Sequence, residues 1–453
     1  MNIHPEKIIL PEDVRIIINK LEEAGYKAYA AGGCIRDSLL GRDPQDWDIA
    51  SSAPPQKVTA VFNGRRTILT GMKHGTVTLV LNGVNYEITT FRTETLYSDG
   101  RRPDSVVFTN NLYEDLSRRD FTVNAMAFNE TEGLVDPFNG QEDLEKKVLR
   151  CVGDPSARFS EDALRMLRAV RLSAQLGFTV ESAAYDAIKA NAPLLGRISA
   201  ERIASEFNAI LMSDRPETIY LLVDTGLISH IAPEFEACIS TRQDSRYHSH
   251  NVGEHTVRSV ALAEKDLIQR MSLFLHDIGK PFSISTDEKG GRHFSGHAAV
   301  SAEIADKILK RLKYPRKFSV MVRKLVLNHD IKFKNDDFCI RKLLAQYGEE
   351  LLFRLIRIRE ADIGAQNPEF AGERLGRLAK FKESAERIIG EGACTSLERL
   401  AVKGSDLAAA GVTEEGRIIG EILGRLLDAV IEKPSLNEKD KLLELAASIK
   451  SEE

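Results

Sequence analysis

Residues 32–50 read GGCIRDSLLGRDPQDWDIA, and this stretch predicts how the N-terminal part of the chain folds. The apolar run YKAYAA at residues 26–31 precedes it and is typical of a short buried strand. Residues 34–40, after the paired glycines, have the pattern of a helix that Gly41 ends. A second short strand is expected at residues 47–50. Strand, glycine pair, helix and strand in this order predict a small α/β head.

The same stretch contains a candidate phosphate and metal site. Backbone N–H groups of Gly32 and Gly33, at the start of the expected helix, are suited to phosphate oxygens. Asp46 and Asp48 lie two apart on the expected strand, so their carboxylates face one side. Paired carboxylates repel each other unless a cation neutralises them, and oxygen ligands suit Mg²⁺ on a nucleoside triphosphate. Glu87, in YEITTFR, is a candidate third carboxylate for phosphoryl transfer.

Surface decoration is the ordinary explanation of an isolated D-x-D. Here the glycine pair, Arg36-Asp37 and the D-x-D follow one another within 17 residues, and this order favours a functional site.

The rest of the chain predicts a helical protein attached to this head. Residues 76–81 and 84–91 flank Asn82-Gly83, a strong hairpin signal that indicates a mixed or antiparallel sheet. After Asp154-Pro155 strand signals nearly vanish. Residues 160–176 have helical periodicity with Ser160 as the expected N-cap. We therefore predict an α+β fold, with a small mixed-sheet head and an all-α remainder.

Composition narrows the class of protein. The chain has 453 residues, 43% of them apolar and 28% charged, which is typical of a globular protein of roughly three domains. No apolar run approaches a membrane span, and residues 1–20 do not resemble a signal peptide. Five widely spaced cysteines indicate reduced thiols in a cytoplasmic protein. A net charge of −5 does not suggest a general nucleic-acid binder, although local basic patches remain compatible with it.

Four ordered motifs resemble class II CCA-adding enzymes and bacterial poly(A) polymerases. The first is residues 32–50, and the others are DLSRRDFTVNA at 115–125, GLVDPF at 133–138 and EDALR at 161–165. The resemblance covers about residues 25–235, and KGSDL at 403–407 is weakly similar to the family's tail. It implies template-independent addition of CMP and AMP to the 3′ end of tRNA from CTP and ATP, with release of diphosphate. Mg²⁺, tRNA, CTP and ATP are the implied cofactor and partners; other protein partners are not predicted.

The resemblance also implies a nucleotide-binding set. Arg118 and Arg119 are suited to clamp triphosphate oxygens, and Asp120 or Asn124 to bond a ribose hydroxyl. Asp162 and Arg165, three apart on the expected helix, offer an acceptor and a forked donor to the Watson–Crick edge of cytosine or adenine. The full predicted set is Gly32, Gly33, Arg36, Arg118, Arg119, Asp120, Asn124, Asp162, Arg165, Arg168 and Arg171.

Each of these motifs also has a purely structural interpretation. Arg-Arg-Asp at 118–120 is compatible with a salt-bridged junction between elements. Asp162 favours a helix N-terminus, and Arg165 is then its surface ion-pair partner. Without the resemblance, these explanations would be preferred.

Histidines predict a second site. Seven of the ten histidines fall between His248 and His329. His276-Asp277 follows an apolar run and resembles the HD phosphohydrolase superfamily, whose divalent-metal ligands map onto His255, His276, Asp277 and Asp330. His297 and His329 occupy places where some members bind a second metal, and histidines packed in a helical core are the alternative. The metal's identity is not predicted.

A basic stretch lies between these motifs. Residues 306–324 contain eight basic residues and one acidic residue. A solvated helix face is the ordinary explanation, and a site for RNA phosphates is the alternative.

Together these patterns predict four parts: a nucleotidyltransferase head (1–152), a helical neck and body for base selection and RNA binding (153–240), an HD domain (241–345) and a helical tail (346–453). Within the family, the alternatives are a poly(A) polymerase or an enzyme that adds only A or only CC. Residues 92–104 resemble the loop that CC-only members tend to lack, which favours complete CCA addition. Outside this family there are two alternatives. The chain could be mainly a metal-dependent RNA phosphohydrolase whose head binds RNA, which would not need the D-x-D, or an RNA chaperone, which would need neither site.

Overall fold

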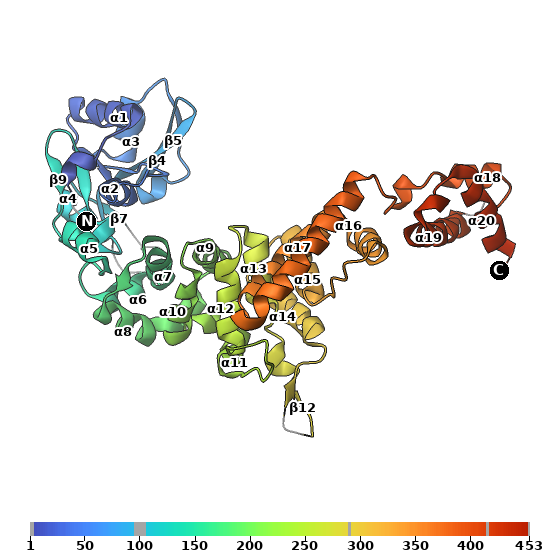
Figure 1. Cartoon of the computed structure of the whole chain (residues 1–453). Coiled ribbons are helices and arrows are strands. Elements are labelled where there is room, and N and C mark those ends of the chain that lie inside the picture. The colour runs from blue at the N-terminus through green and yellow to red at the C-terminus, as the bar shows by residue number, and fades with distance from the viewer. Residues whose placement is uncertain (1–3, 95–105, 289–290, 414–415, 452–453) are drawn as a thin grey trace. The chain divides into compact units, whose positions relative to one another are not determined.

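The computed structural model describes residues 4–94, 106–288, 291–413 and 416–451. The chain divides into two compact units, Met1–Pro233 with Arg311–Lys313, and Glu234–Lys310 with Tyr314–Glu453. Strands are concentrated in the first part of the chain, drawn blue to cyan in Figure 1, and helices dominate from α6 onward. The predicted α+β class is confirmed. None of the helices in the described ranges combines the length and apolarity needed to cross a bilayer.

A mixed seven-stranded sheet forms the centre of the head, with strand order β3-β4-β5-β2-β1-β8-β9. The β2–β5 pair is parallel, and the other neighbouring pairs are antiparallel. Aromatic and aliphatic side chains such as Tyr29, Phe91 and Leu116 pack into one core beside it. The strands are β1 (Ala28–Ala31), β2 (Ile49–Ser51), β3 (Arg66–Ile68), β4 (Thr76–Leu81), β5 (Val84–Thr90), β8 (Ala127–Asn129) and β9 (Gly133–Val135).

Short helices and strand pairs complete the head. The helices are α1 (Glu12–Glu23), α2 (Gly33–Leu39), α3 (Pro55–Val61), α4 (Leu112–Ser117) and α5 (Gly140–Lys146). β6 (Arg92–Glu94) pairs with β7 (Val106–Phe108), and β10 (Val148–Leu149) pairs with β11 (Thr179–Val180). Most of the expected loop at residues 92–104 lies outside the described residues, so its role stays a prediction.

The predicted hairpin is present, and the D-x-D requires a correction. Asn82 (φ 49°) and Gly83 (φ 82°) both have positive φ, as a two-residue turn between β4 and β5 demands. The strand expected at residues 47–50 begins only at Ile49, so Asp46 and Asp48 precede it. Asp48 still joins the sheet through its backbone, because its carbonyl accepts from Ala31 N (3.0 Å).

The helix expected at residues 160–176 is two helices in the structure. α6 (Pro155–Glu161) ends at Asp162, whose φ and ψ of −138° and 103° are extended, and α7 (Leu164–Leu176) begins after it. Ser160 therefore lies inside α6 and is not an N-cap; Asp154 caps α6 by accepting from Ala157 N (2.7 Å). Asp162 accepts from the backbone N–H of Leu164 (3.0 Å), the first residue of α7, whose N-cap is Ala163. The remaining helices of this unit are α8 (Ser182–Asn191), α9 (Ala200–Leu211) and α10 (Ile219–Asp224).

The second unit is almost entirely helical. Its helices are α11 (Glu234–Ser240), α12 (Val252–Leu262), α13 (Leu267–Leu275), α14 (His297–Arg311), α15 (Arg316–Asn328), α16 (Asp337–Gly364), α17 (Pro368–Gly390), α18 (Gly404–Ala409), α19 (Gly416–Glu432) and α20 (Lys439–Ser451). β12 (Ser285–Thr286) and β13 (Arg292–His293) form a small hairpin. Gly348 (φ 72°, ψ 165°) interrupts α16 close to the expected border at residue 345.

Candidate functional site

Three exposed carboxylate residues, Asp46, Asp48 and Glu87, lie around the start of β2 and the adjacent central strand β5. Ile49 of β2 pairs in parallel register with Ile88 of β5. Asp48 and Glu87 are the residues directly before this pair, and so they are neighbours on the two adjacent strands. The pKa of Asp48 is raised, first by desolvation and then by the charge of Glu87, while Arg119 partly offsets the rise and Asp46 adds to it. Asp46 and Glu87 thus lie near enough to act on the charge of Asp48, although among the described residues these three do not form a group with ligand atoms within 4.8 Å of one another. Mutual repulsion of this kind is what a bound divalent cation relieves.

The glycine pair lies beside the arginine motif. Gly32 has a φ of 95°, and a Cβ at this position would lie 2.6 Å from Arg119 Nη1. Any side chain here would be strained and would displace the Arg119 guanidinium. Arg36, on α2, donates to Asn124 Oδ1 (2.7 Å) and to Asp37. Gly32, Arg36, Arg119 and Asn124 of the predicted nucleotide-binding set therefore converge.

Asp115, which was not predicted as a site residue, positions both arginines of this motif. It is 1% exposed, and Arg118 Nη2 donates to it at 2.7 Å while Arg119 Nη2 lies 3.5 Å away. A buried carboxylate that contacts two guanidinium groups fixes their direction. The signal for Asp115 in the sequence was its place in the second motif.

Asp120 is directed into the protein. It is 6% exposed, accepts from Asn124 Nδ2 (3.1 Å) and lies 3.0 Å from Arg168 Nη2 on α7. Burial would raise the pKa of Asp120, but the positive charge of Arg168 and the hydrogen bond from Asn124 hold it below its ordinary value. Asp120 therefore ties the head to α7 as an ionised group, and a contact with ribose stays a prediction.

The predicted base-selecting pair does not form a pair in the structure. Arg165 is 8% exposed and binds the Glu161 carboxylate and the backbone carbonyls of Arg118 and Arg158 (both 3.1 Å). Asp162, in the break between α6 and α7, instead accepts from Arg202 Nη2 of α9 (2.8 Å). The two side chains are thus held separately.

Arg171 of α7 also has an ion-pair partner on α9. Its Nε lies 2.9 Å from Glu206 Oε2. Sequence reasoning did not select Arg202 or Glu206, because their relevance depends on how α9 packs against α7.

A second site is formed by six side chains, which we call the His–Asp cluster: His255, His276, Asp277, His297, His329 and Asp362. Two triads within it have ligand atoms spaced closely enough for a metal ion, His255–His276–Asp277 and Asp277–His297–His329. Asp277 belongs to both. All members except His297 are nearly fully buried.

The hydrogen bonds of three histidines orient their free ring nitrogens inward. Nδ1 of His276, His297 and His329 lies within 2.6–2.9 Å of the backbone carbonyl three residues earlier. A carbonyl can only accept, so Nδ1 is the donor and Nε2 carries the lone pair of the neutral ring. Nε2 of His297 and of His329 face each other at 3.2 Å. Two facing lone pairs need a cation or proton near them, and the donor set therefore fits a divalent metal.

Without a bound cation, the charges of His276 and Asp277 act on each other. Burial would lower the pKa of His276, but the charge and hydrogen bond of Asp277 raise it above its ordinary value. Burial would likewise raise the pKa of Asp277, but His276 and Lys280 hold it well below its ordinary range. Asp277 is therefore an ionised carboxylate inside the unit.

Asp362 lies where Asp330 was expected. Asp330 is not brought into the His–Asp cluster, since its side chain is 56% exposed and lies 3.2 Å from Arg359. Asp362, on α16, is buried, with Oδ1 3.0 Å from His255 Nε2 and 4.0 Å from His276 Nε2. The predicted residues His255, His276 and Asp277 converge, and Asp362 lies beside them without belonging to either triad. Asp362 also lies past the expected border at residue 345.

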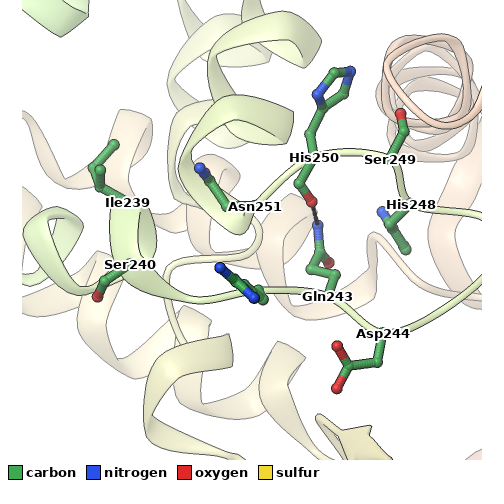
Figure 2. Close-up of a pocket in the computed structure, with 9 residues that line it drawn as sticks. Ile239, Ser240, Gln243, Asp244, His248, Ser249, His250 and Asn251 are labelled. Atoms are coloured by element: carbon green, nitrogen blue, oxygen red, sulfur yellow. Dashed lines mark hydrogen bonds between the residues drawn. The ribbon is translucent and has the colours of Figure 1, made fainter.

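One cavity adjoins the cluster, and a second shares His248 with the first. The smaller, of about 170 Å³, is lined by cluster residues and by several cationic side chains. The larger, of about 540 Å³, is formed by the segment that joins α11 to α12 (Figure 2). The side-chain amide of Gln243 connects the linings of the two cavities. Its Nε2 donates to the backbone carbonyl of His250 in the larger cavity (3.3 Å), and its Oε1 accepts from Lys280 in the smaller one (2.7 Å). His248 lines both cavities.

Comparison with known proteins identifies the family. The CCA-adding enzyme of Leuconostoc mesenteroides is 34% identical over 441 residues, which cover 96% of this chain and 95% of that protein. The chain belongs to the CCA-adding enzyme family. Residues 28–150 match the family described as poly A polymerase head domain, residues 177–239 the probable RNA and SrmB-binding site of polymerase A, and residues 282–446 the putative domain 2 of tRNA nucleotidyltransferase. The predicted resemblance is confirmed.

Solved structures of the family have the same fold. The Bacillus stearothermophilus CCA-adding enzyme in complex with CTP has a TM-score of 0.74 and 30% identity, and covers 98% of both chains. The Thermotoga maritima CCA-adding enzyme complexed with tRNA shares the fold at a TM-score of 0.59 and 20% identity. Other relatives have a higher identity over a shorter segment. The CCA-adding enzyme of Limosilactobacillus reuteri is 50% identical over 205 residues, which cover 45% of this chain and 50% of that protein.

Proposed function

We propose that the protein adds CMP and AMP to the 3′ end of tRNA, using CTP and ATP and releasing diphosphate. The observation that carries this proposal is the convergence of Asp46, Asp48 and Glu87 beside the arginine motif, in a chain that matches a CCA-adding enzyme along 96% of its length. The five cysteines are free thiols, which supports a cytoplasmic site of action.

The residues of the head suggest how the reaction would proceed. Asp46, Asp48 and Glu87 would hold Mg²⁺, which when bound supplies positive charge to the reacting phosphate. Arg36 and Arg119, beside Gly32, would bind the triphosphate and orient its α-phosphate. The 3′ hydroxyl oxygen of the RNA would form a bond to the α-phosphorus, and the bond to diphosphate would break. Asp162 and Arg165 would select the base by hydrogen bonds.

Asp162 and Arg165 both have protein partners. Arg165 forms an ion pair with Glu161, and Asp162 forms an ion pair with Arg202. We infer that a cytosine or adenine edge replaces part of these contacts, so that selection is an exchange of hydrogen bonds within a preformed network.

The test is incubation of the full chain with tRNA that lacks its 3′ CCA, with each labelled nucleotide separately and with CTP and ATP together. Sequenced products that end in CCA are expected. Products with only A, only CC, or long A tails would establish one of the alternative activities instead. A protein that extends no RNA end in Mg²⁺ would contradict the proposal.

A second function, metal-dependent phosphohydrolysis, is supported by the His–Asp cluster. Its residues would hold a divalent metal, which when bound activates water. The water oxygen would bond to phosphorus, and the ester bond to the leaving alcohol would break. A 3′-phosphate or a 2′,3′-cyclic phosphate at an RNA end blocks extension, so such an activity would prepare ends for the head.

Asp362 and Asp330 form a matched pair for this test. We expect Asp362→Ala to lose metal, measured by plasma mass spectrometry of the purified protein, because it removes a buried carboxylate of the cluster. Asp330→Ala should retain metal and hydrolysis. Metal loss from the Asp330 variant alone would return the assignment to Asp330. Absence of both metal and hydrolysis in the wild type would refute the second function.

A further inference from the structure

Three cationic side chains line the smaller cavity next to the His–Asp cluster. Lys280 follows α13, Arg359 belongs to α16 and Arg374 belongs to α17. Helices that are separate in the sequence thus bring positive charge to one small space. A cavity of about 170 Å³ is below the size of an ordinary ligand pocket and suits a phosphate group more than a whole nucleotide.

Two of these cations have carboxylate partners. Lys280 Nζ lies 2.6 Å from Asp277 Oδ2. Arg359 Nη1 lies 2.8 Å from Asp362 Oδ2 and 3.2 Å from Asp330 Oδ1. Asp277 and Asp362 are also cluster residues. If Asp277 and Asp362 bind a metal ion, their negative charge is shared with the metal and neutralises less of the charge on Lys280 and Arg359. A bound metal would therefore leave the cavity more positive.

Arg374 has no such partner. Its guanidinium donates to the Gln366 side-chain oxygen and lies 5.1 Å from the centroid of the Tyr247 ring. Among the residues that the structure describes, no carboxylate lies within ion-pair distance of it. Burial, and then the charge of Arg359, lower the pKa of Arg374, and the charges of Asp362 and Asp330, which lie beyond ion-pair distance, offset this only in part. A half-buried guanidinium near a second one is costly without an anion, and this cost indicates that an anion binds.

We propose that Arg374, with Arg359 and Lys280, forms an anion clamp that makes this cavity select phosphate monoesters over phosphodiesters. A monoester carries nearly two negative charges at neutral pH and three terminal oxygens, which match several forked donors. A diester has one charge and two such oxygens. The organic part of the ester has the 540 Å³ cavity beside His248 available. This proposal rests on the proposed hydrolytic function and names its substrate class: of the two blocked RNA ends considered there, it favours the 3′-phosphate, a monoester, over the 2′,3′-cyclic phosphate, a diester.

The kinetic test compares two substrates with the same leaving group, p-nitrophenyl phosphate and bis-p-nitrophenyl phosphate. Arg374→Gln should raise KM for the monoester by about tenfold or more, since a charged hydrogen bond is lost, and change KM for the diester by no more than about twofold. Arg374→Lys should restore part of the monoester KM. Arg377→Gln, an exposed arginine on the same helix that pairs with Glu373, is the control and should change neither.

A binding measurement separates the clamp from the hydrolytic activity. Inorganic phosphate is titrated calorimetrically into the metal-loaded full-length wild type and Arg374→Gln, with metal content measured in both. We expect phosphate affinity to fall about tenfold at equal metal content. Equal phosphate affinity in both proteins, or an equal loss of both esters, would overturn the clamp. Arg374-dependent phosphate binding in a protein that hydrolyses neither ester would uphold the clamp and refute the hydrolytic function.

Discussion

The carboxylate of Asp48 lies close to two others, and its pKa is raised by desolvation and by Glu87. The folded protein therefore holds this proton more tightly than the unfolded chain does, so the ionised group lowers stability as pH rises above the ordinary carboxyl pKa. We expect Asp48→Asn to raise the melting temperature at pH 7.5 in EDTA and to reduce nucleotide addition by about 100-fold or more.

Addition in Mg²⁺ and thermal melting of the same samples measure both effects. Asp43→Asn, exposed in the loop before the D-x-D, should change neither. Near-wild-type addition by Asp48→Asn or Asp48→Ala would show that the head carboxylates are not catalytic.

Arg165 combines a structural and a proposed base-selecting role. Its guanidinium binds Glu161 and two backbone carbonyls, so Arg165→Ala leaves buried acceptors unpaired. This costs ~1–3 kcal/mol, and we expect the preference for CTP over UTP to fall by about tenfold. Arg158→Ala also removes a contact with Glu161 and should keep the base preference. Uniformly slower addition with an unchanged CTP-to-UTP ratio in Arg165→Ala would make the residue purely structural.

Among the elements, α7 is fastened to the head by the Arg168–Asp120 ion pair. The pKa of Asp120 is lowered in the folded protein, so the ionised carboxylate contributes stability above its unfolded pKa, and this contribution is lost as pH falls through the folded value. Arg168→Ala should lower the free energy of unfolding at pH 7 by ~1–2 kcal/mol, less than for a fully buried pair because Arg168 is 38% exposed.

Urea unfolding from pH 7 down to well below the ordinary carboxyl pKa of about 3.9 measures this effect. The difference between wild type and Arg168→Ala should shrink toward acid pH. Arg197→Ala, at an exposed position in the same unit, is the control. A difference that stays constant or grows toward acid pH would show that the pair does not stabilise the junction through charge.

For the molecule as a whole, the two sites lie in separate compact units, the D-x-D in the first and the His–Asp cluster in the second. His276→Ala combined with Asp277→Ala removes ligands from both triads. The double variant should lose metal and hydrolysis and keep nucleotide addition within about twofold, because the head carboxylates belong to the other unit. A folded double variant that no longer extends tRNA would show that the second unit is needed for addition.

Local sequence signals were sufficient for much of this organisation. The hairpin at Asn82-Gly83 and the helix after Gly32-Gly33 depend on backbone preferences of neighbouring residues, which the sequence states directly. The order of the four motifs was enough to predict the family. The break at Asp162 was not predicted because the apolar periodicity continues across it, while the side chain of Asp162 accepts from the backbone of Leu164, where the second helix begins.

By itself, the sequence determined the α+β class and the family, and it selected the three head carboxylates and most of the metal-ligand candidates as predictions, because these depend on residue type and short spacing. Only the tertiary structure decided that Asp362 joins the His–Asp cluster in place of Asp330, that Asp162 binds Arg202, and that Arg374 enters a cationic cavity. Each of these contacts depends on how helices far apart in the chain pack against one another, and packing of distant segments leaves no local pattern in the sequence.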